Sequence, residues 1–246
     1  LVSQTLAAVN VPTVTKAGFV NNSVFDSMVG SPGDRLAVLT KPPLTVLSAS
    51  LECQPLPLHQ QIAQAIRPLI TQGITEMKIL PLFLSPGVHV CDDLPTEVNQ
   101  AQMKLGSRCQ LTLLPHLGSL PALPAFLAHC FEQYQTQPQA QRLLLAHGSR
   151  RTGGNTAIAN VAQSLNAQVA FWKTEPSLGQ ALSRFSLPAQ VVILPYFLFA
   201  GGITDLIQTQ IQQLRTQYPE LDLILGDPLG PHPVLARLIA EALTQG

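Results

Sequence analysis

The sequence predicts an α/β protein of two similar halves, each a parallel sheet flanked by helices, with a cleft between the halves. The first observation behind this prediction is an alternation along the chain. Short apolar runs, typical of buried strands, take turns with segments whose apolar residues recur three and four positions apart. The second observation is an internal repeat at a spacing of about 110 to 120 residues. A spacing of this size suits two small α/β units that face each other.

The repeat rests on three pairs of segments that occur in the same order in both halves. They are PLFL at 81–84 with PYFL at 195–198, LGSLP at 117–121 with LGPHP at 229–233, and QPLPL at 54–58 with TEPSL at 174–178. Their offsets of 114, 112 and 120 residues agree to within a few residues, which indicates two copies of one unit. We therefore expect a first half at 1–138 and a second half at 139–246.

Each half is expected to alternate strands with helices, which favours right-handed crossovers between parallel strands. In the second half the expected strands are 142–146, 168–172, 190–194 and 221–225, and the expected helices are 156–165, 178–185, 206–218 and 234–243. In the first half the strands are 44–48, 78–82 and 110–114, and the helices are 60–71, 95–105 and 122–132. Before these elements the sequence gives only a weak helix at 5–9 and a weak strand near 13–15.

Composition argues against nucleic acid and membranes as partners. Only 11% of the 246 residues are charged and the net charge is zero, so no bulk field attracts a polyanion or an anionic bilayer. The longest apolar stretch, 191–203, is too short to span a membrane and contains a proline and two glycines. No secretory signal is visible, and we expect a cytoplasmic protein. The chain begins with Leu1 rather than Met, which leaves open whether a motif precedes it.

The four cysteines are expected to be reduced and mostly buried. Their spacing is too wide for a zinc or iron–sulfur motif of their own. They are Cys53, Cys91, Cys109 and Cys130.

One candidate site follows the strand expected at 142–146, where the sequence reads His147-Gly148-Ser149-Arg150-Arg151. In open α/β sheets ligands bind at the carboxyl ends of the strands. An imidazole there can hold a metal ion or take a proton near neutral pH. Two guanidinium groups beside it suit an anionic ligand.

A second candidate site is the loop after the PLFL strand of the first half. His89 again lies just beyond a strand, with Asp92 and Asp93 three and four positions further on. Taken alone, the two aspartates are best interpreted as caps of the helix that follows. Two histidines at equivalent sheet edges of a duplicated fold nevertheless favour a shared function. The matching loop of the second half contains Gly201 and Gly202.

These motifs resemble those of the class II tetrapyrrole chelatases, in particular the long, two-copy form of sirohydrochlorin chelatase. The resemblance covers residues 50–244 and rests on HGSRRTGGN, PLFLSPGVHVCDDLP and PLGPHP. It implies two chelatase-like halves and ATP-independent insertion of Fe²⁺ or Co²⁺ into sirohydrochlorin, toward siroheme or cobalamin. The divalent metal is then a substrate, and no organic cofactor is expected.

Carried over residue by residue, the resemblance makes His89 and His147 the catalytic, metal-receiving histidines. It also implies that Asp92 and Asp93 attract the cation or pass protons. A third set is expected to bind the tetrapyrrole: Gly148, Ser149, Arg150, Arg151, Gly201 and Gly202. Glu175 and His232 are weaker candidates, whereas His59, His116 and His129 are interpreted as structural.

The chain departs from the family pattern in how it distributes the histidines. Both usually occur within one copy, but here His89 belongs to the first half and His147 to the second. Alignment of Pro81 with Pro195 places Ile203 opposite His89. The sequence leaves open a composite site or a first-half site whose other part is absent or altered. A catalytically weakened tetrapyrrole- or metal-binding protein is the alternative function. The sequence does not decide which metal is inserted. It also leaves open what the first 45 residues do and whether the protein is a monomer or a homodimer.

Overall fold

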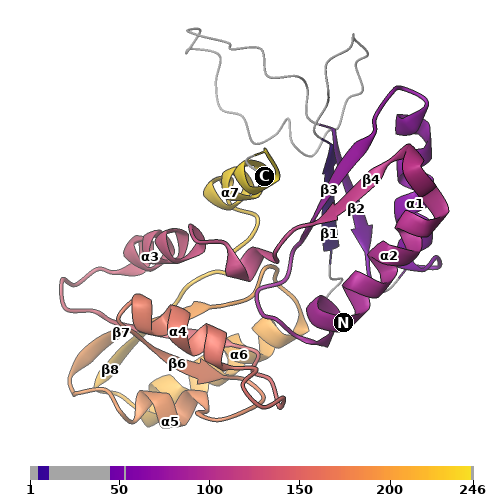
Figure 1. The fold of residues 1–246 in the computed structure, drawn as a ribbon. Coiled ribbons are helices and arrows are strands. Elements are labelled where there is room, and N and C mark those ends of the chain that lie inside the picture. The colour runs from indigo at the N-terminus through magenta and orange to yellow at the C-terminus, as the bar shows by residue number, and fades with distance from the viewer. Residues whose placement is uncertain (1–4, 11–44, 53, 245–246) are drawn as a thin grey trace, which may run out of the picture.

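A computed structural model describes residues 5–10, 45–52 and 54–244 of the chain. They form two lobes, each built on a four-stranded sheet (Figure 1). The first sheet has the order β2-β1-β3-β4 and the second β6-β5-β7-β8, so each strand of one sheet has a counterpart at the same place in the other. The prediction of an α/β fold with two repeated halves is confirmed.

The strands are those that the apolar runs predict, with one addition at the start of the chain. In the first sheet they are β1 (Thr5–Asn10), β2 (Val46–Ser50), β3 (Glu76–Pro81) and β4 (Gln110–Leu113). In the second they are β5 (Gln141–Ala146), β6 (Ala167–Phe171), β7 (Ala189–Pro195) and β8 (Leu221–Leu225). β5 and β7 are central and almost wholly buried, since a parallel sheet covered on both faces needs continuous apolar runs.

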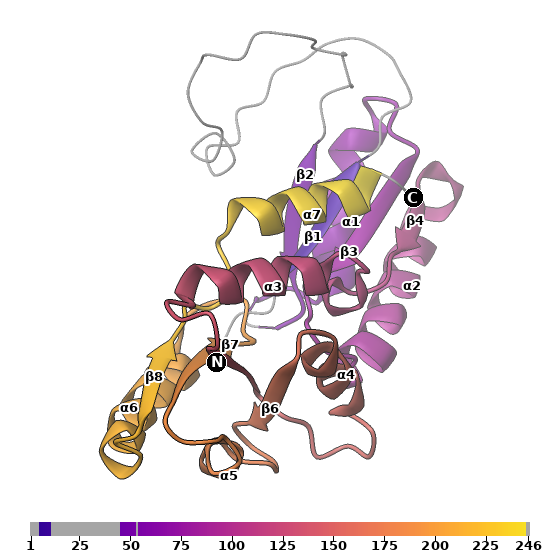
Figure 2. The ribbon, with the colours of Figure 1, turned by 90° about the vertical axis from the view of Figure 1, so that its left-hand side faces the viewer.

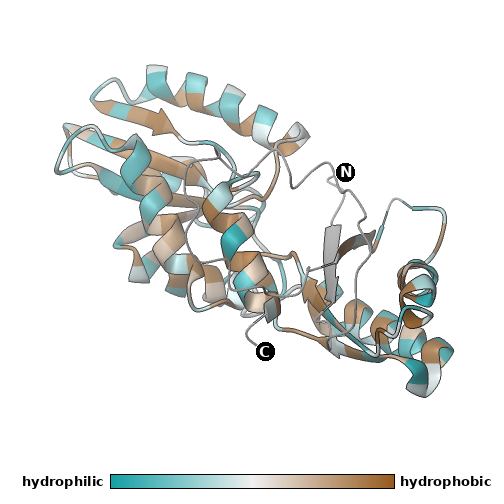
Figure 3. Cartoon of the chain, turned by 90° about the horizontal axis from the view of Figure 1, so that it is seen from above, coloured by the Kyte–Doolittle hydropathy of each residue, from teal (hydrophilic) through white to brown (hydrophobic). Residues whose placement is uncertain are grey.

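Seven α-helices occur in the described ranges, together with three short helical turns. The helices are α1 (Leu58–Ile70), α2 (Leu94–Leu105), α3 (Leu123–Tyr134), α4 (Thr156–Ser164), α5 (Leu178–Leu182), α6 (Gly202–Gln217) and α7 (Pro233–Thr244). The turns are η2 (His89–Asp93), η3 (Gly106–Arg108) and η4 (Leu117–Ser119). Hydrophobic and hydrophilic residues mix along the helices, as expected where one helix face covers a sheet (Figure 3).

The largest boundary error lies at α6, which begins four residues before the expected helix 206–218. Thr204 explains the early start. Its hydroxyl accepts the N–H of Gly201 at 2.8 Å and thereby organises the first turn.

β1 corrects two expectations. Residues 5–9 form a strand rather than a weak helix, because pairing with β2 and β3 on both sides outweighs a weak local preference. β1 also runs antiparallel to both neighbours, so the first sheet is not purely parallel as expected, whereas the second sheet is. In its register Leu6 faces Pro81 and Asn10 faces Met77. The carboxyl end of β1 therefore points away from the edge at which β3 ends. The strand expected near 13–15 lies outside the described residues.

Two helices are exchanged between the lobes. α3 precedes the second half in sequence, yet its Phe126, Leu127 and Phe131 pack in one core cluster with Leu144 and Leu194 of the second sheet. α7 ends the second half, yet its Leu243 packs against Leu80 of β3. The two helices lie side by side between the sheets (Figure 2). Helix packing thus crosses the proposed boundary at residues 138 and 139, which stays a prediction.

Gln190 fixes the connection between α3 and β5 onto the second sheet. Its buried amide oxygen accepts the N–H groups of Thr136 at 3.1 Å and Gln137 at 3.2 Å. Its amide nitrogen donates to Thr136 Oγ1 at 2.7 Å and to Asp222 Oδ2 at 2.8 Å. All hydrogen-bonding groups of this buried side chain are used, so it ties the connection between the halves to β7 and β8.

Among the described residues, no helix is long and apolar enough to cross a membrane.

We predict that Gln190→Ala lowers the free energy of unfolding by about 2 kcal/mol, because it removes the four hydrogen bonds of a buried side chain. Urea unfolding followed by circular dichroism measures the change. Gln213→Ala, on the exposed face of α6, is the matched control and should be near neutral. Equal losses in the two variants would contradict the anchoring role.

Candidate active site

Gly148 directs the chain sharply away from β5 and leaves His147 at the carboxyl edge of the second sheet. The φ of Gly148 is +83°, in the left-handed region that glycine adopts most readily. A Cβ at this position would lie 2.5 Å from Thr174 Oγ1 and 2.9 Å from Phe171 Cβ, so no larger residue fits. The His147 carbonyl accepts the N–H of Lys173 at 2.9 Å, which continues the pairing of β5 with β6. His147 itself is exposed.

Asn155 holds the turn that follows. Its Oδ1 accepts the N–H of Ser149 at 2.7 Å and its Nδ2 donates to Thr174 Oγ1 at 3.0 Å. The Ser149 hydroxyl accepts the N–H of Arg151 at 3.2 Å. The turn is therefore braced from within, while the side chains of Arg150 and Arg151 remain exposed.

His89 opens a single π-helical turn, η2, that leads directly into α2. Its Nδ1 lies 2.7 Å from Asp93 Oδ2, one helical turn further on. Its Nε2 lies 3.6 Å from Glu52 Oε1, just after β2. The interpretation of Asp93 as a helix cap is therefore wrong: the chain is already helical from His89, and Asp93 makes no side-chain capping bond. Asp92 makes none either, and its backbone carbonyl accepts Thr96 Oγ1.

The carboxylate of Asp93 fixes the proton of His89. A carboxylate only accepts hydrogen bonds, so Nδ1 donates a proton to Asp93, and in the neutral imidazole the lone pair is then on Nε2. In many metal sites a carboxylate that does not itself bind the metal orients the ligating imidazole in this way. Glu52 lies on the same side as the free lone pair, so a divalent cation approaching Nε2 also meets negative charge. The same lone pair can instead accept a proton.

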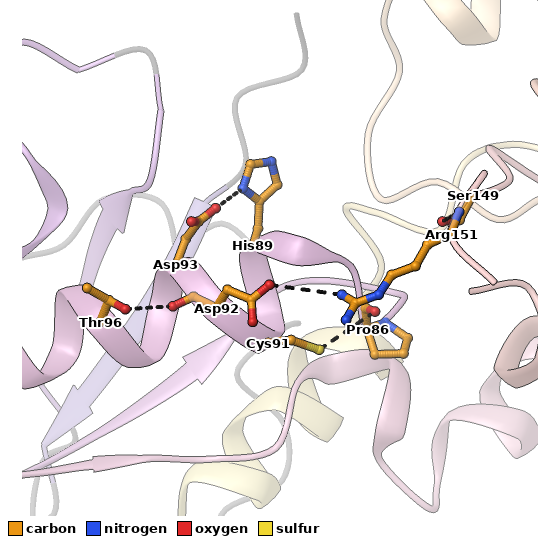
Figure 4. A network of polar contacts seen from close by, with 8 residues as sticks. All are labelled: Pro86, His89, Cys91, Asp92, Asp93, Thr96, Ser149 and Arg151. Carbon is orange, nitrogen blue, oxygen red and sulfur yellow. Dashed lines mark hydrogen bonds and ion pairs between the residues drawn. The ribbon is translucent and has the colours of Figure 1, made fainter. Parts of the chain in front are cut away.

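One ion pair links the two candidate loops. Arg151 Nη1 lies 4.0 Å from Asp92 Oδ2, and Figure 4 shows the arginine reaching from the second lobe to the turn that holds His89. Both side chains are more than half exposed, so this contact marks proximity rather than strong binding. Asp92 therefore faces Arg151 while Asp93 faces His89, and the two aspartates have different partners.

The remaining predicted residues fall outside this arrangement. Gly201 precedes α6 and Gly202 begins it, after the loop that follows β7. Ile203 lies in the first turn of α6, at the place that His89 has after β3. Glu175 Oε2 accepts the nearby N–H of Ser177. In the described part of the chain, no three side chains of His, Cys, Asp or Glu converge as a ready metal site. A composite site of His89 and His147 stays a prediction, as does the cleft.

Two of the other histidines have partners of their own. His59 pairs with Glu97 at 2.9 Å and joins α1 to α2. The ring centroids of His232 and Phe126 lie 5.1 Å apart. Burial, together with the nearby His129, lowers the pKa of His232. Burial also lowers the pKa of His116.

Two residues of the site were missed from the sequence. Glu52 is a carboxylate placed at the carboxyl edge of β2, and the edge rule that singled out His89 applies to it equally. Asn155 gave a weaker signal, because an asparagine before a helix is expected to cap that helix. Its side chain instead bonds across the turn to Ser149 and Thr174.

The sequence comparison identifies the family. The CbiX family model matches residues 48–134 and matches again at residues 141–246. The chain belongs to the CbiX family. The double match also agrees with the internal repeat, since each match covers one copy of the CbiX unit.

Two curated proteins of Priestia megaterium are similar to this CbiX chain. A sirohydrochlorin cobaltochelatase is 23% identical over 199 residues, which are 75% of this chain and 65% of the relative. A sirohydrochlorin ferrochelatase is 25% identical over 192 residues, which are 73% of this chain and 71% of the relative. The chain thus spans about two thirds of the length of the cobaltochelatase.

Solved structures have the same fold. SirB from Bacillus subtilis with Fe³⁺ aligns at a TM-score of 0.64 and 21% identity, over 79% of this chain and 81% of SirB. CbiX, described as the terminal enzyme for biosynthesis of siroheme in denitrifying bacteria, aligns at 0.54 and 25% identity, over 76% of this chain and 89% of that chain.

We predict that Cys91 is alkylated at least about tenfold faster than Cys109 and Cys130 in the folded protein at pH 8. Cys91 is exposed and the other two are buried. Burial raises the pKa of the Cys130 thiol to about 11, and burial with Glu76 nearby raises that of Cys109. Both therefore remain protonated and unreactive at this pH. Iodoacetamide labelling with peptide mass spectrometry measures the alkylation rates. Unfolding the protein in urea should make the rates of the three cysteines similar. Rapid labelling of Cys130 in the folded chain would contradict the packing of α3.

Proposed function

We propose that this chain inserts a divalent metal ion, Fe²⁺ or Co²⁺, into sirohydrochlorin without ATP, toward siroheme or cobalamin. The observation that carries the proposal is the His89 imidazole held by Asp93, with Glu52 beside its free nitrogen. Membership of the CbiX family and the names of the two curated relatives supply the substrate class. The metal is a substrate that leaves with the product, and no organic cofactor is invoked. A cytoplasmic location and a monomer or homodimer remain parts of the proposal.

The residues divide the chemistry into metal delivery and proton removal. Two pyrrole N–H protons must leave as one M²⁺ ion enters, so the net charge of the macrocycle core does not change. The free Nε2 of His89 receives the cation, and Glu52 lowers the cost of bringing it there. Once the ion passes to the macrocycle, the neutral imidazoles of His89 and His147 accept the two protons. Asp93 stabilises the imidazolium that forms on His89, because it already accepts the Nδ1 proton.

The second lobe supplies the groups for the anionic periphery of the substrate. Arg150 and Arg151 are exposed and positive, beside the braced turn at Gly148 and Ser149. Substrate carboxylates are proposed to pair with them, and Arg151 would then exchange Asp92 for the ligand. Gly201 and Gly202, at the equivalent edge after β7, are proposed to allow close approach of the macrocycle.

A weakened tetrapyrrole- or metal-binding protein is the alternative function, and one observation favours it. β1 occupies the place of β5 in the first sheet but runs the opposite way, so its carboxyl end lies far from His89. A histidine that followed β1 would therefore not reach this edge. Such a protein would bind the substrate and insert metal slowly.

The direct test is anaerobic absorbance of sirohydrochlorin mixed with the full chain and either Fe²⁺ or Co²⁺, against a reaction without protein. The chelatase predicts accelerated conversion to the spectrum of the metallated product, and the faster metal indicates the pathway. A shifted spectrum without acceleration favours the binder. No spectral response from folded protein rejects both tetrapyrrole functions.

His89→Ala is predicted to lower the insertion rate by about 100-fold or more, because it removes both the metal ligand and a proton acceptor. His147→Ala should give a similar loss if the site is composite. His59→Gln is the matched control, since His59 also pairs with a carboxylate but lies between α1 and α2. It should keep the parental rate at temperatures where all variants are folded. A rate for His89→Ala equal to that of His59→Gln would contradict the assignment.

A further inference from the structure

Tyr196 connects the segments that carry the two histidines. It directly follows β7, and its N–H donates to the carbonyl of Leu145 at 2.8 Å, two residues before His147. Its hydroxyl donates to the carbonyl of Leu84 at 3.1 Å, in the loop that leads to His89. The side chain is buried, and burial raises its pKa, so the hydroxyl keeps the proton that it donates. One residue thus joins the second sheet to the first-half loop.

Gly118 also holds this loop segment. The N–H of Gly118 donates to the carbonyl of Phe83 at 2.8 Å. The backbone comes so close that a Cβ on Gly118 would lie 2.1 Å from Leu84 O. The centroid of the Phe83 ring lies 6.1 Å from the centroid of the His89 imidazole. Gly118 of the first half and Tyr196 of the second half therefore both hold the segment of Phe83 and Leu84, here called the clamp. Leu84 lies five positions before His89.

The equivalent loop of the second copy receives no such hydroxyl bond from the first copy. Its backbone contacts are present, since Phe197 O and Leu198 O accept the N–H groups of Leu229 and Gly230 at 2.8 and 2.9 Å. The residue that corresponds to Tyr196, when Pro81 is aligned with Pro195, is the aliphatic Leu82. The additional bond thus acts on the loop that has a histidine, and not on the loop that has Ile203 in its place.

We propose that Tyr196 is a positioning residue for metal insertion, which holds the His89 loop at a fixed distance from the His147 loop through its hydrogen bond to Leu84. The inference rests on the proposed chelatase function. Tyr196 does not contact the reacting groups, and it acts by limiting the movement of the segment that carries His89. A displacement of about 1 Å between catalytic groups and substrate costs up to roughly 100-fold in rate, so a single buried hydroxyl is sufficient for such an effect.

Tyr196→Phe in the full chain tests this inference, because it removes the hydroxyl and keeps the ring in the core. Tyr134→Phe is the matched control. Its hydroxyl donates to Asp227 Oδ2 at 2.8 Å and also joins distant parts of the chain, but it does not touch the His89 loop. Two readouts are compared: steady-state insertion kinetics with metal-free sirohydrochlorin binding, and amide hydrogen exchange of peptides that cover residues 84–93.

For Tyr196→Phe we expect a roughly tenfold lower kcat and binding of metal-free sirohydrochlorin within about twofold of the parent. Exchange should accelerate in residues 84–93 and stay unchanged elsewhere. For Tyr134→Phe, kcat and the exchange of these residues should match the parent. An unchanged kcat in Tyr196→Phe, or exchange that accelerates equally throughout the chain, overturns the positioning role. If the parent inserts no metal, the proposed function fails. The exchange comparison then still decides whether Tyr196 holds the loop, and unchanged exchange in residues 84–93 overturns the inference.

Discussion

The exchange of α3 and α7 between the two sheets determines how the rest of the molecule is arranged. Phe126, Leu127 and Phe131 of α3 share a buried cluster with β5 and β7, while Leu243 of α7 packs on β3. Each helix thus packs against the sheet of the other copy, and Leu235 of α7 also joins the cluster of the second sheet. Because interiors are close-packed, neither lobe can rotate freely without disrupting this shared core. The apolar packing between the copies therefore fixes which loops meet, and the polar contacts between those loops follow from it.

Within this frame the two copies have diverged into complementary parts. The first copy presents an imidazole with carboxylates near both ring nitrogens, at His89, Asp93 and Glu52. The second copy presents a braced turn with an exposed histidine and two arginines. The pair of Asp92 and Arg151 marks the place where the two parts approach each other. A duplicated unit needs its full set of groups only once, so this division is compatible with a single site shared by the two copies. It also agrees with the presence of Ile203, rather than a histidine, in the second-copy loop.

Much of this arrangement could be predicted from sequence, because it depends on local pattern. Buried parallel strands are continuous apolar runs, and their carboxyl ends meet at one edge, so the positions of His89 and His147 follow from strand ends alone. The contacts of Glu52 and Tyr196 depend on residues 37 and 112 positions away, which no periodicity reveals. Asp93 was assigned to capping because the π-helical turn at His89 has no clear sequence signal. β1 was missed since its strand state comes from its neighbours.

The location of a bound cobalt ion decides whether the Nε2 atom of His89 receives the metal. Crystals of the full chain soaked with Co²⁺ can be measured at the cobalt absorption edge, where anomalous scattering locates the ion. We expect a peak roughly 2 Å from His89 Nε2, with the carboxylate of Glu52 turned toward it. Ordered cobalt elsewhere, for example between His59 and Glu97, with none beside His89, would show that His89 is not the metal-receiving residue.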